Sequence, residues 1–290
     1  MFFVYQCKHT HNSMRNNIEI QQPLFKEFEI DKIAEGISFI RDNIGTKTAF
    51  VGFSGGKDSI VTADLMKRSG VKYELYYSFT GIDPPEVVRF IRKYYPECIF
   101  LKPKQTFWRN LSVHTPPSDR LRWCCTSLKK ESGWDVPLEH RVMGIRKEES
   151  SKRSKYPRIN FFEKLRHTHY YPILNFNEAD IWEYIKSNEL PYPSLYDEGF
   201  DRLGCIVCPY HSERTGKKHK QYRDRWPKYF NRFERGIKEL YNKRVSQGKT
   251  MHYDTPEEFI QAWYVKNSAR WYKEVERATQ TSQKQGGEHE

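Results

Sequence analysis

Short apolar runs alternate along the chain with segments whose apolar residues recur at helical spacing, and this alternation predicts the order of the secondary structure. The first segment, residues 24–44, is expected to be a helix that leads into a buried strand over 48–53. The elements expected next are a helix over 59–68, a strand over 72–79, a helix that begins at Pro84-Pro85, strands over 98–103 and 140–146, and a helix over 176–187 capped by Asn177. Repeated strand–helix units predict an α/β fold with a doubly wound, mostly parallel sheet.

The pattern changes after this last helix. Pro and Gly are frequent in residues 190–204, which we expect to form an ordered loop. Beyond residue 210 the chain is predicted to be helical, with a last helix over 255–278 that begins at Thr255-Pro256. We therefore expect four parts: an N-terminal arm over 1–23, a domain over 24–210, a basic, aromatic helical extension over 211–275 and a disordered tail over 276–290.

Small and polar residues, Ser54-Gly55-Gly56-Lys57-Asp58-Ser59, join the first strand to its helix. The two glycines permit unusual backbone angles and a close approach of ligand to main chain. Ser59 is expected to cap the helix, whose free N–H groups would then lie at the positive end of the helix dipole. Such a turn is a site for phosphate. It is neither the Walker pattern nor the three-glycine dinucleotide pattern, and a plain polar turn is the alternative.

The chain has a net charge of +12, and the positive charge is concentrated in residues 214–244, with twelve Lys or Arg against three Asp or Glu. Aromatic residues interrupt this segment, as in surfaces that contact phosphates and bases together. The candidate nucleic-acid contacts are Lys217, Lys218, Lys220, Arg223, Trp226 and Tyr229. A solvated helix face, or a basic surface that surrounds a polyphosphate substrate, are the alternatives.

No apolar run approaches the roughly 20 residues that span a bilayer, and the apolar run at the N-terminus is too short for a signal peptide. We therefore expect a cytoplasmic protein that does not contact membranes, with cysteines that are reduced or bind metal.

Four of the six cysteines form two pairs, Cys124-Cys125 and Cys205-x-x-Cys208. Four thiolates are enough for a tetrahedral zinc ion or a [4Fe–4S] cluster. The alternatives are ordinary buried residues at Cys124 and Cys125, and redox pairing of Cys205 with Cys208. Cys7 and Cys98 have no evident partner.

Several motifs together resemble those of known families. The SGGKDS turn resembles the PP-loop of the N-type ATP pyrophosphatases. The tandem cysteines, followed about 80 residues later by Cys-x-x-Cys, are similar to the cluster motif of the assimilatory adenylylsulfate reductases. "TGIDPPE", "GIRKEES" and residues 171–209 resemble the wider phosphoadenosine phosphosulfate (PAPS) reductase family. The resemblance covers roughly residues 30–210 and implies an adenine nucleotide α-hydrolase-like domain that binds ATP or a sulfonucleotide.

The resemblance also suggests roles for individual residues. Phosphates would be cradled by main-chain groups and hydroxyls of Ser54, Gly55, Gly56, Lys57 and Ser59. Lys57 would offset their charge and Asp58 would orient Mg²⁺ or a loop N–H. Arg146 resembles the anion-binding arginine of the family, with a salt bridge to Glu148 or Glu149 as the alternative. The adenosine would lie near Thr80, Gly81 and Asp83, which otherwise form a simple turn.

Two departures from the sulfonucleotide reductase pattern favour ATP cleavage over reduction: SGGKDS is intact, and no cysteine follows Cys208. The expected function is an ATP pyrophosphatase that releases PPi and adenylates an acceptor for sulfur transfer, similar to the DNA-phosphorothioation enzymes and supplied by a sulfur-donor protein. An iron–sulfur reductase of adenylylsulfate or PAPS, and a non-catalytic nucleotide- or DNA-binding regulator, are the alternatives.

Overall fold

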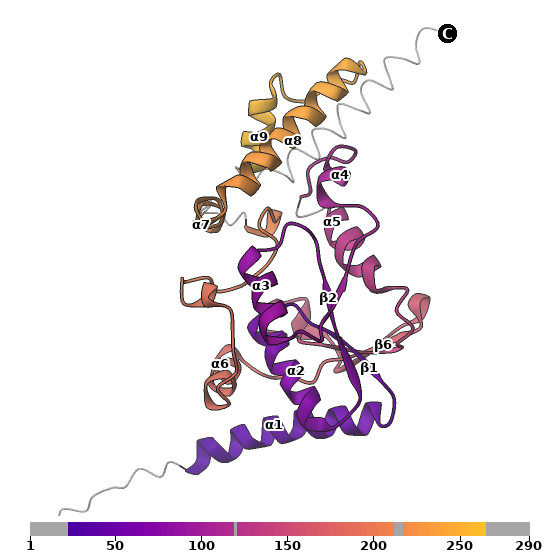
Figure 1. Cartoon of the computed structure of the whole chain (residues 1–290), viewed down its shortest axis with the longest axis vertical. Coiled ribbons are helices and arrows are strands. Elements are labelled where there is room, and N and C mark those ends of the chain that lie inside the picture. Colours follow the sequence, from indigo (N-terminus) through magenta and orange to yellow (C-terminus); the bar gives the residue numbers. More distant parts are fainter. Residues whose placement is uncertain (1–22, 119–120, 212–216, 265–290) are drawn as a thin grey trace, which may run out of the picture.

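The structure is a computed structural model that describes residues 23–118, 121–211 and 217–264 (Figure 1). The expected N-terminal arm with Cys7, the end of the expected last helix and the expected tail therefore lie outside the described residues.

Within the described residues, six strands form one sheet in the order β3-β2-β1-β4-β6-β5. Their bounds are β1 Ala49–Gly52, β2 Tyr73–Ser78, β3 Ile99–Leu101, β4 His140–Met143, β5 Ile159–Phe162 and β6 His167–Tyr170. All neighbouring strands are parallel except β5, which runs antiparallel to β6 at the edge of the sheet. The prediction of a mostly parallel sheet is confirmed.

The central strand β1 fixes the position of the site. Val51 of β1 lies opposite Leu75 of β2 on one side and opposite Val142 of β4 on the other. The strand order therefore reverses at β1, and ligands of open α/β sheets bind at such a switch point, beyond the carboxyl ends of the strands. The turns that follow β1, β2 and β4 all leave the sheet at this end.

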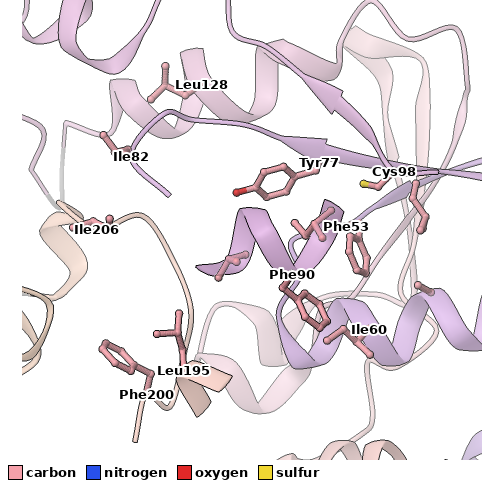
Figure 2. Packing of buried hydrophobic residues seen from close by; sticks show 14 of the residues in the cluster. Phe53, Ile60, Tyr77, Ile82, Phe90, Cys98, Leu128, Leu195, Phe200 and Ile206 are labelled. Carbon is pink, nitrogen blue, oxygen red and sulfur yellow. The ribbon is translucent and has the colours of Figure 1, made fainter. Parts of the chain in front are cut away.

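Helices cover the sheet and supply much of its core. The helices of the expected nucleotide domain are α1 Pro23–Ile44, α2 Lys57–Ser69, α3 Pro85–Tyr94 and α6 Glu178–Ser187, and both α1 and α6 pack against α2. Ile60 of α2 is fully buried, and Figure 2 shows it in the same layer as Phe53, which follows β1, and Phe90 of α3. The apolar spacing that predicts these helices thus also identifies the faces that they bury.

Two regions were not predicted. The strands β5 and β6 are polar or exposed on much of their surface, so they lack the apolar alternation that marks a strand. The chain between β3 and β4 contains the short helices α4 Phe107–Leu111 and α5 Trp123–Cys125. Helices of so few residues produce no readable periodicity.

The basic C-terminal region forms α7 Lys217–Arg225, α8 Pro227–Ser246 and α9 Pro256–Tyr264. In Figure 1 these helices stand beside α4, at the end of the molecule remote from α1. Phe233 of α8 packs on Phe107 of α4, and the indole of Trp263 donates a 2.8 Å hydrogen bond to the carbonyl of Pro117. The region is therefore continuous with the core that surrounds the sheet. Among the described helices, none combines the length and apolar character needed to cross a membrane.

Candidate functional site

The turn after β1 is a tight turn that contains two glycines. Gly55 lies in the left-handed region at φ +71°, and a Cβ there would meet the side chain of Ile91 at 2.9 Å. The hydroxyl of Ser54 accepts a hydrogen bond from the N–H of Gly56 at 3.3 Å. The helix α2 begins at Lys57, two residues earlier than predicted, and its N-cap is Gly56.

Ser59 is therefore not the helix cap, and that prediction is wrong. Its hydroxyl lies within the first turn, where it donates to the carbonyl of Gly56 at 2.8 Å and accepts from the N–H of Ser54 at 3.2 Å. The Ser59 hydroxyl therefore stabilises the turn, since it bonds to Ser54 before the two glycines and to the second glycine, Gly56.

Lys57 is buried at the start of α2 and is held by residues far away in the sequence. Its ammonium donates to the carbonyl of Asp201 at 2.7 Å and lies 3.3 Å from a carboxylate oxygen of Glu178. Its main-chain N–H donates to the hydroxyl of Tyr196 at 3.0 Å. Sequence reasoning missed Glu178, Tyr196 and Asp201 as parts of the site, because only the fold brings α6 and the following loop to the PP-loop.

Asp58 and Arg146 meet across the switch point. The Nε of Arg146 donates to Oδ1 of Asp58 at 2.5 Å, and its Nη1 lies 2.5 Å from Oε2 of Glu148. The predicted site residues are thus brought together, and the salt bridge to Glu148 named as an alternative is also present. Gly144 allows this approach, since a Cβ there would lie 2.8 Å from the carbonyl oxygen of Asp58.

The turn after β2 carries the three residues predicted to lie near adenosine. Thr80 and Asp83 are buried, and the N–H of Thr80 donates to Oδ2 of Asp83 at 2.7 Å. Gly81 has a positive φ of 76°. Burial, together with the charge of Asp83, raises the pKa of Tyr77 beneath this turn. These contacts stabilise the turn, and an adenosine site at these residues stays a prediction.

The four paired cysteines converge beside that turn. Hydrogen bonding to Cys125, burial, and the nearby charges of Cys205 and Cys208 raise the pKa of Cys124. Cys205 Sγ lies 3.8 Å from the hydroxyl of Thr80, and the N–H of Ile206 donates to the carbonyl of Ile82 at 2.7 Å. The Cys205 loop is therefore tied directly to the turn after β2.

Within the described ranges, no three His, Cys, Asp or Glu side chains are arranged to hold a metal ion. The donor chemistry nevertheless suits one, because four soft thiols lie within electrostatic range of one another and beside a cation. That cation is Lys129, whose pKa is raised chiefly by the charge of Cys205. Sequence reasoning missed Lys129 because it is one of many surface-type lysines. Cys98 is buried in the core.

The structure separates the nucleic-acid candidates. Trp226 is buried at 5% exposure, donates to Glu86 at 3.1 Å and packs on Phe200, so it belongs to the core rather than to a stacking surface. The interleaved aromatic pattern that suggested stacking is instead the buried face of a helix. The remaining candidates are distributed as follows: Lys217 and Lys218 lie in the first turn of α7, Lys220 pairs with Asp224, Arg223 pairs with Glu234, and Tyr229 is half-buried against Trp108.

The mostly parallel sheet, with the SGGKDS turn at its switch point and Arg146 in the turn after the neighbouring strand β4, defines an α/β protein of the doubly wound class. The phosphoadenosine phosphosulfate reductase domain matches residues 48–211, and the chain belongs to this family.

Relatives fall into two groups. An uncharacterized protein of Methanocaldococcus jannaschii is 30% identical over 214 residues, which are 68% of this chain and 43% of the relative. Adenosine 5'-phosphosulfate reductase 1 of Bacillus subtilis is 27% identical over 173 residues, 53% of this chain and 70% of the relative. A PAPS reductase from Candida auris, solved with phosphate, has a TM-score of 0.48 at 18% identity and covers 66% of this chain and 98% of its own. The chain spans about half the length of the archaeal relatives that it matches, 43% and 55%.

Proposed function

We propose that the protein is an ATP pyrophosphatase of the PAPS reductase family, which binds ATP at residues 54–59 and releases PPi as it adenylates an acceptor. The observation that carries this proposal is the complete SGGKDS loop at the start of α2, with Lys57 and Arg146 beside it. Two nearly buried cations beside a turn of main-chain N–H groups suit a group that carries several negative charges.

The chemistry follows from charge and alignment. An acceptor oxygen attacks the α-phosphorus, the bond from that phosphorus to the α–β bridging oxygen breaks, and PPi leaves with the negative charge. Lys57 and Arg146 offset this charge, and the loop holds the β and γ phosphates in line. Asp58 is the carboxylate that would hold Mg²⁺, whose contribution when bound is further neutralisation of the phosphates.

The acceptor and the sulfur step are proposed from the cysteines and the charge. Cys124, Cys125, Cys205 and Cys208 would hold a [4Fe–4S] cluster, with zinc as the other candidate; a cluster supplies redox or sulfur chemistry when bound. The basic C-terminal segment supports a nucleic-acid acceptor, as in DNA phosphorothioation, with sulfur delivered by a donor protein.

A second function is favoured by a different observation. Relatives that match the nucleotide domain carry the name adenosine 5'-phosphosulfate reductase. Under this alternative the same loop binds the phosphates of a sulfonucleotide, and an external thiol supplies the electrons. A non-catalytic nucleotide- or DNA-binding regulator is the third candidate, and it would bind nucleotide without turnover.

The test compares turnover of the two nucleotide classes. Full-length protein, purified anaerobically, is incubated with ATP–Mg²⁺ and a short DNA duplex, and PPi release is measured; sulfite release from adenylylsulfate is measured in parallel with a dithiol. We expect PPi release that falls at least about 100-fold in Lys57→Ala, because a preorganised charge at the leaving group is worth a few kcal/mol. Lys67→Ala, on the exposed face of the same helix, is the matched control. Sulfite release without PPi release would establish the reductase instead.

A further inference from the structure

Glu178 joins the two cations of the phosphate site through one carboxylate. Its Oε1 lies 3.3 Å from the ammonium of Lys57, and its Oε2 lies 3.8 Å from Nη2 of Arg146. The two cations come from different elements, the start of α2 and the turn after β4. Their side chains are 5% and 4% exposed, whereas that of Glu178 is 50% exposed.

The charges in this cluster are unequal. Lys57 and Arg146 supply two positive charges, and their ion-pair partners Asp58, Glu148 and Glu178 supply three negative ones. A polyphosphate that entered the site would therefore meet a cluster with a net negative charge, unless one carboxylate left its partners.

Glu178 is the carboxylate best placed to leave. Asp58 is part of the loop itself, and Glu148 contacts only Arg146 among these two cations. Glu178 alone among the described carboxylates pairs with both, and half of its side chain already faces solvent. Turning it outward removes one negative charge from both cations at once, while Arg146 keeps Asp58 and Glu148, and returns a carboxylate to water at little desolvation cost.

The backbone that carries Glu178 is anchored, so this motion is confined to the side chain. Asn177 and Asp180 form reciprocal caps: Asn177 Oδ1 accepts from the N–H of Asp180 at 2.8 Å, and Asp180 Oδ2 accepts from the N–H of Asn177 at 2.6 Å. Lys32 of α1 donates to the same carboxylate at 2.7 Å. The start of α6 is thus fixed beside the PP-loop.

We propose that Glu178 is a displaceable counter-anion: it holds Lys57 and Arg146 when the loop is empty and is expelled when a polyphosphate binds. It thereby weakens the binding of every anion and selects for those with enough charge to replace it. The inference rests on the proposed function only in requiring that the loop binds phosphate groups, and it holds for ATP and for a sulfonucleotide alike.

The test measures binding of inorganic pyrophosphate by titration calorimetry in Mg²⁺-free buffer, so that no metal ligand role of a carboxylate contributes. Glu178→Gln keeps the shape and removes the charge, and we expect it to bind pyrophosphate about threefold to tenfold more tightly than the wild type. Glu183→Gln, exposed on the same helix, should bind as the wild type does. Glu148→Gln should gain less, because Glu148 contacts one cation.

The outcomes distinguish this proposal from the proposed function. Unchanged or weaker binding by Glu178→Gln would overturn it and make Glu178 a residue that positions the cations. No pyrophosphate binding by either protein would overturn it too, since the two cations would then not form an anion site. Tighter binding by Glu178→Gln without any ATP cleavage would support the counter-anion proposal. The same result would refute the proposed ATP pyrophosphatase function.

Discussion

Arg146 and Asp58 are 88 positions apart in the sequence, and yet Nε of the arginine lies 2.5 Å from Oδ1 of the aspartate. The sheet explains this pair. Strand β4 lies directly beside β1, so the residues that follow β4 meet the helix that follows β1. The pair therefore spans the switch point and joins the PP-loop to the neighbouring strand.

The first prediction concerns the energy of this pair. Arg146 is 3% exposed, so loss of the Asp58 charge takes the hydrogen-bonded partner of Nε away from a buried guanidinium and leaves it with Glu148 and the more distant Glu178. We expect Asp58→Asn and Arg146→Met each to lower the free energy of unfolding by about 2 kcal/mol, with a coupling of at least about 1 kcal/mol in a double-mutant cycle measured by urea denaturation. The exposed pair Lys220–Asp224 should couple by less than about 0.5 kcal/mol. Equal couplings in both cycles would contradict the buried-pair interpretation.

The second prediction concerns Gly144, which admits the approach of β4 to α2. A Cβ there would lie 2.8 Å from both the carbonyl oxygen of Asp58 and Oγ1 of Thr62. The carbonyl is backbone and cannot rotate away, so Gly144→Ala should destabilise the protein by about 1–3 kcal/mol and weaken ATP binding. Gly204→Ala is the control, because a Cβ there meets nothing within 4 Å. Thermal unfolding and nucleotide titration would show the difference, and similar behaviour of the two variants would refute the steric argument.

Much of the nucleotide domain is readable from sequence because its strands are buried and its turn chemistry is local. The SGGKDS turn predicts its own position between a strand and a helix, and Arg146 lies beside it. What could not be read is the set of distant groups that contact the SGGKDS turn. Glu178 and Tyr196 reach Lys57 from α6 and the loop after it, a contact that only tertiary packing creates.

For the aromatic residues of the basic region, the sequence pattern was misinterpreted. Alternation of charged and aromatic residues is compatible with a stacking surface and with an amphipathic helix, and sequence alone does not separate them. Trp226 is buried because α7 and α8 pack on the nucleotide domain, where Glu86 accepts its indole N–H. The buried aromatic residues of this region thus gave its sequence the composition of a nucleic-acid-binding surface.

The third prediction concerns metal content. We expect anaerobic protein to carry about four iron atoms per chain, the stoichiometry of one [4Fe–4S] cluster. Cys125→Ser and Cys205→Ser should each remove most of the iron, whereas Cys98→Ser should leave the iron unchanged, since that thiol lies in the core. The iron content per chain is measured by elemental analysis, together with the visible absorbance of the protein. One zinc per chain without iron would assign the same cysteines to zinc.

The fourth prediction concerns pH. Burial, with the charges of Arg141 and His167, lowers the pKa of His169 from 6.5 to about 4. The folded state therefore keeps this histidine neutral. Its contribution to the free energy of unfolding is complete above about pH 6.5 and is lost as the pH falls towards 4. The loss attributable to His169 is about 3 kcal/mol at most. Urea denaturation from pH 7.5 to 4.5 should show a weaker acid dependence in His169→Gln than in the wild type, whereas exposed His252→Gln should retain it. If the free energy of unfolding fell equally with pH in all three proteins, His169 would not be the cause of the acid destabilisation.

The last prediction concerns the basic segment. If α7 and its flanks bind nucleic acid, phosphate contacts should dominate, and affinity should fall with salt by about 0.9 in log–log slope for each duplex phosphate neutralised. Changing Lys217, Lys218, Lys220 and Arg223 to Glu should lower both the slope and the affinity while pyrophosphate binding at the loop is retained. Because Trp226 is buried, Trp226→Leu should lower the free energy of unfolding instead. Tyr229 is half-buried, and Tyr229→Leu tests whether this ring stacks on the bases of single-stranded DNA. Fluorescence anisotropy of labelled duplex and single-stranded DNA across a salt series makes the measurement. Salt-independent affinity would remove the nucleic-acid acceptor from the proposal, and the segment would then be a surface that steers a charged substrate.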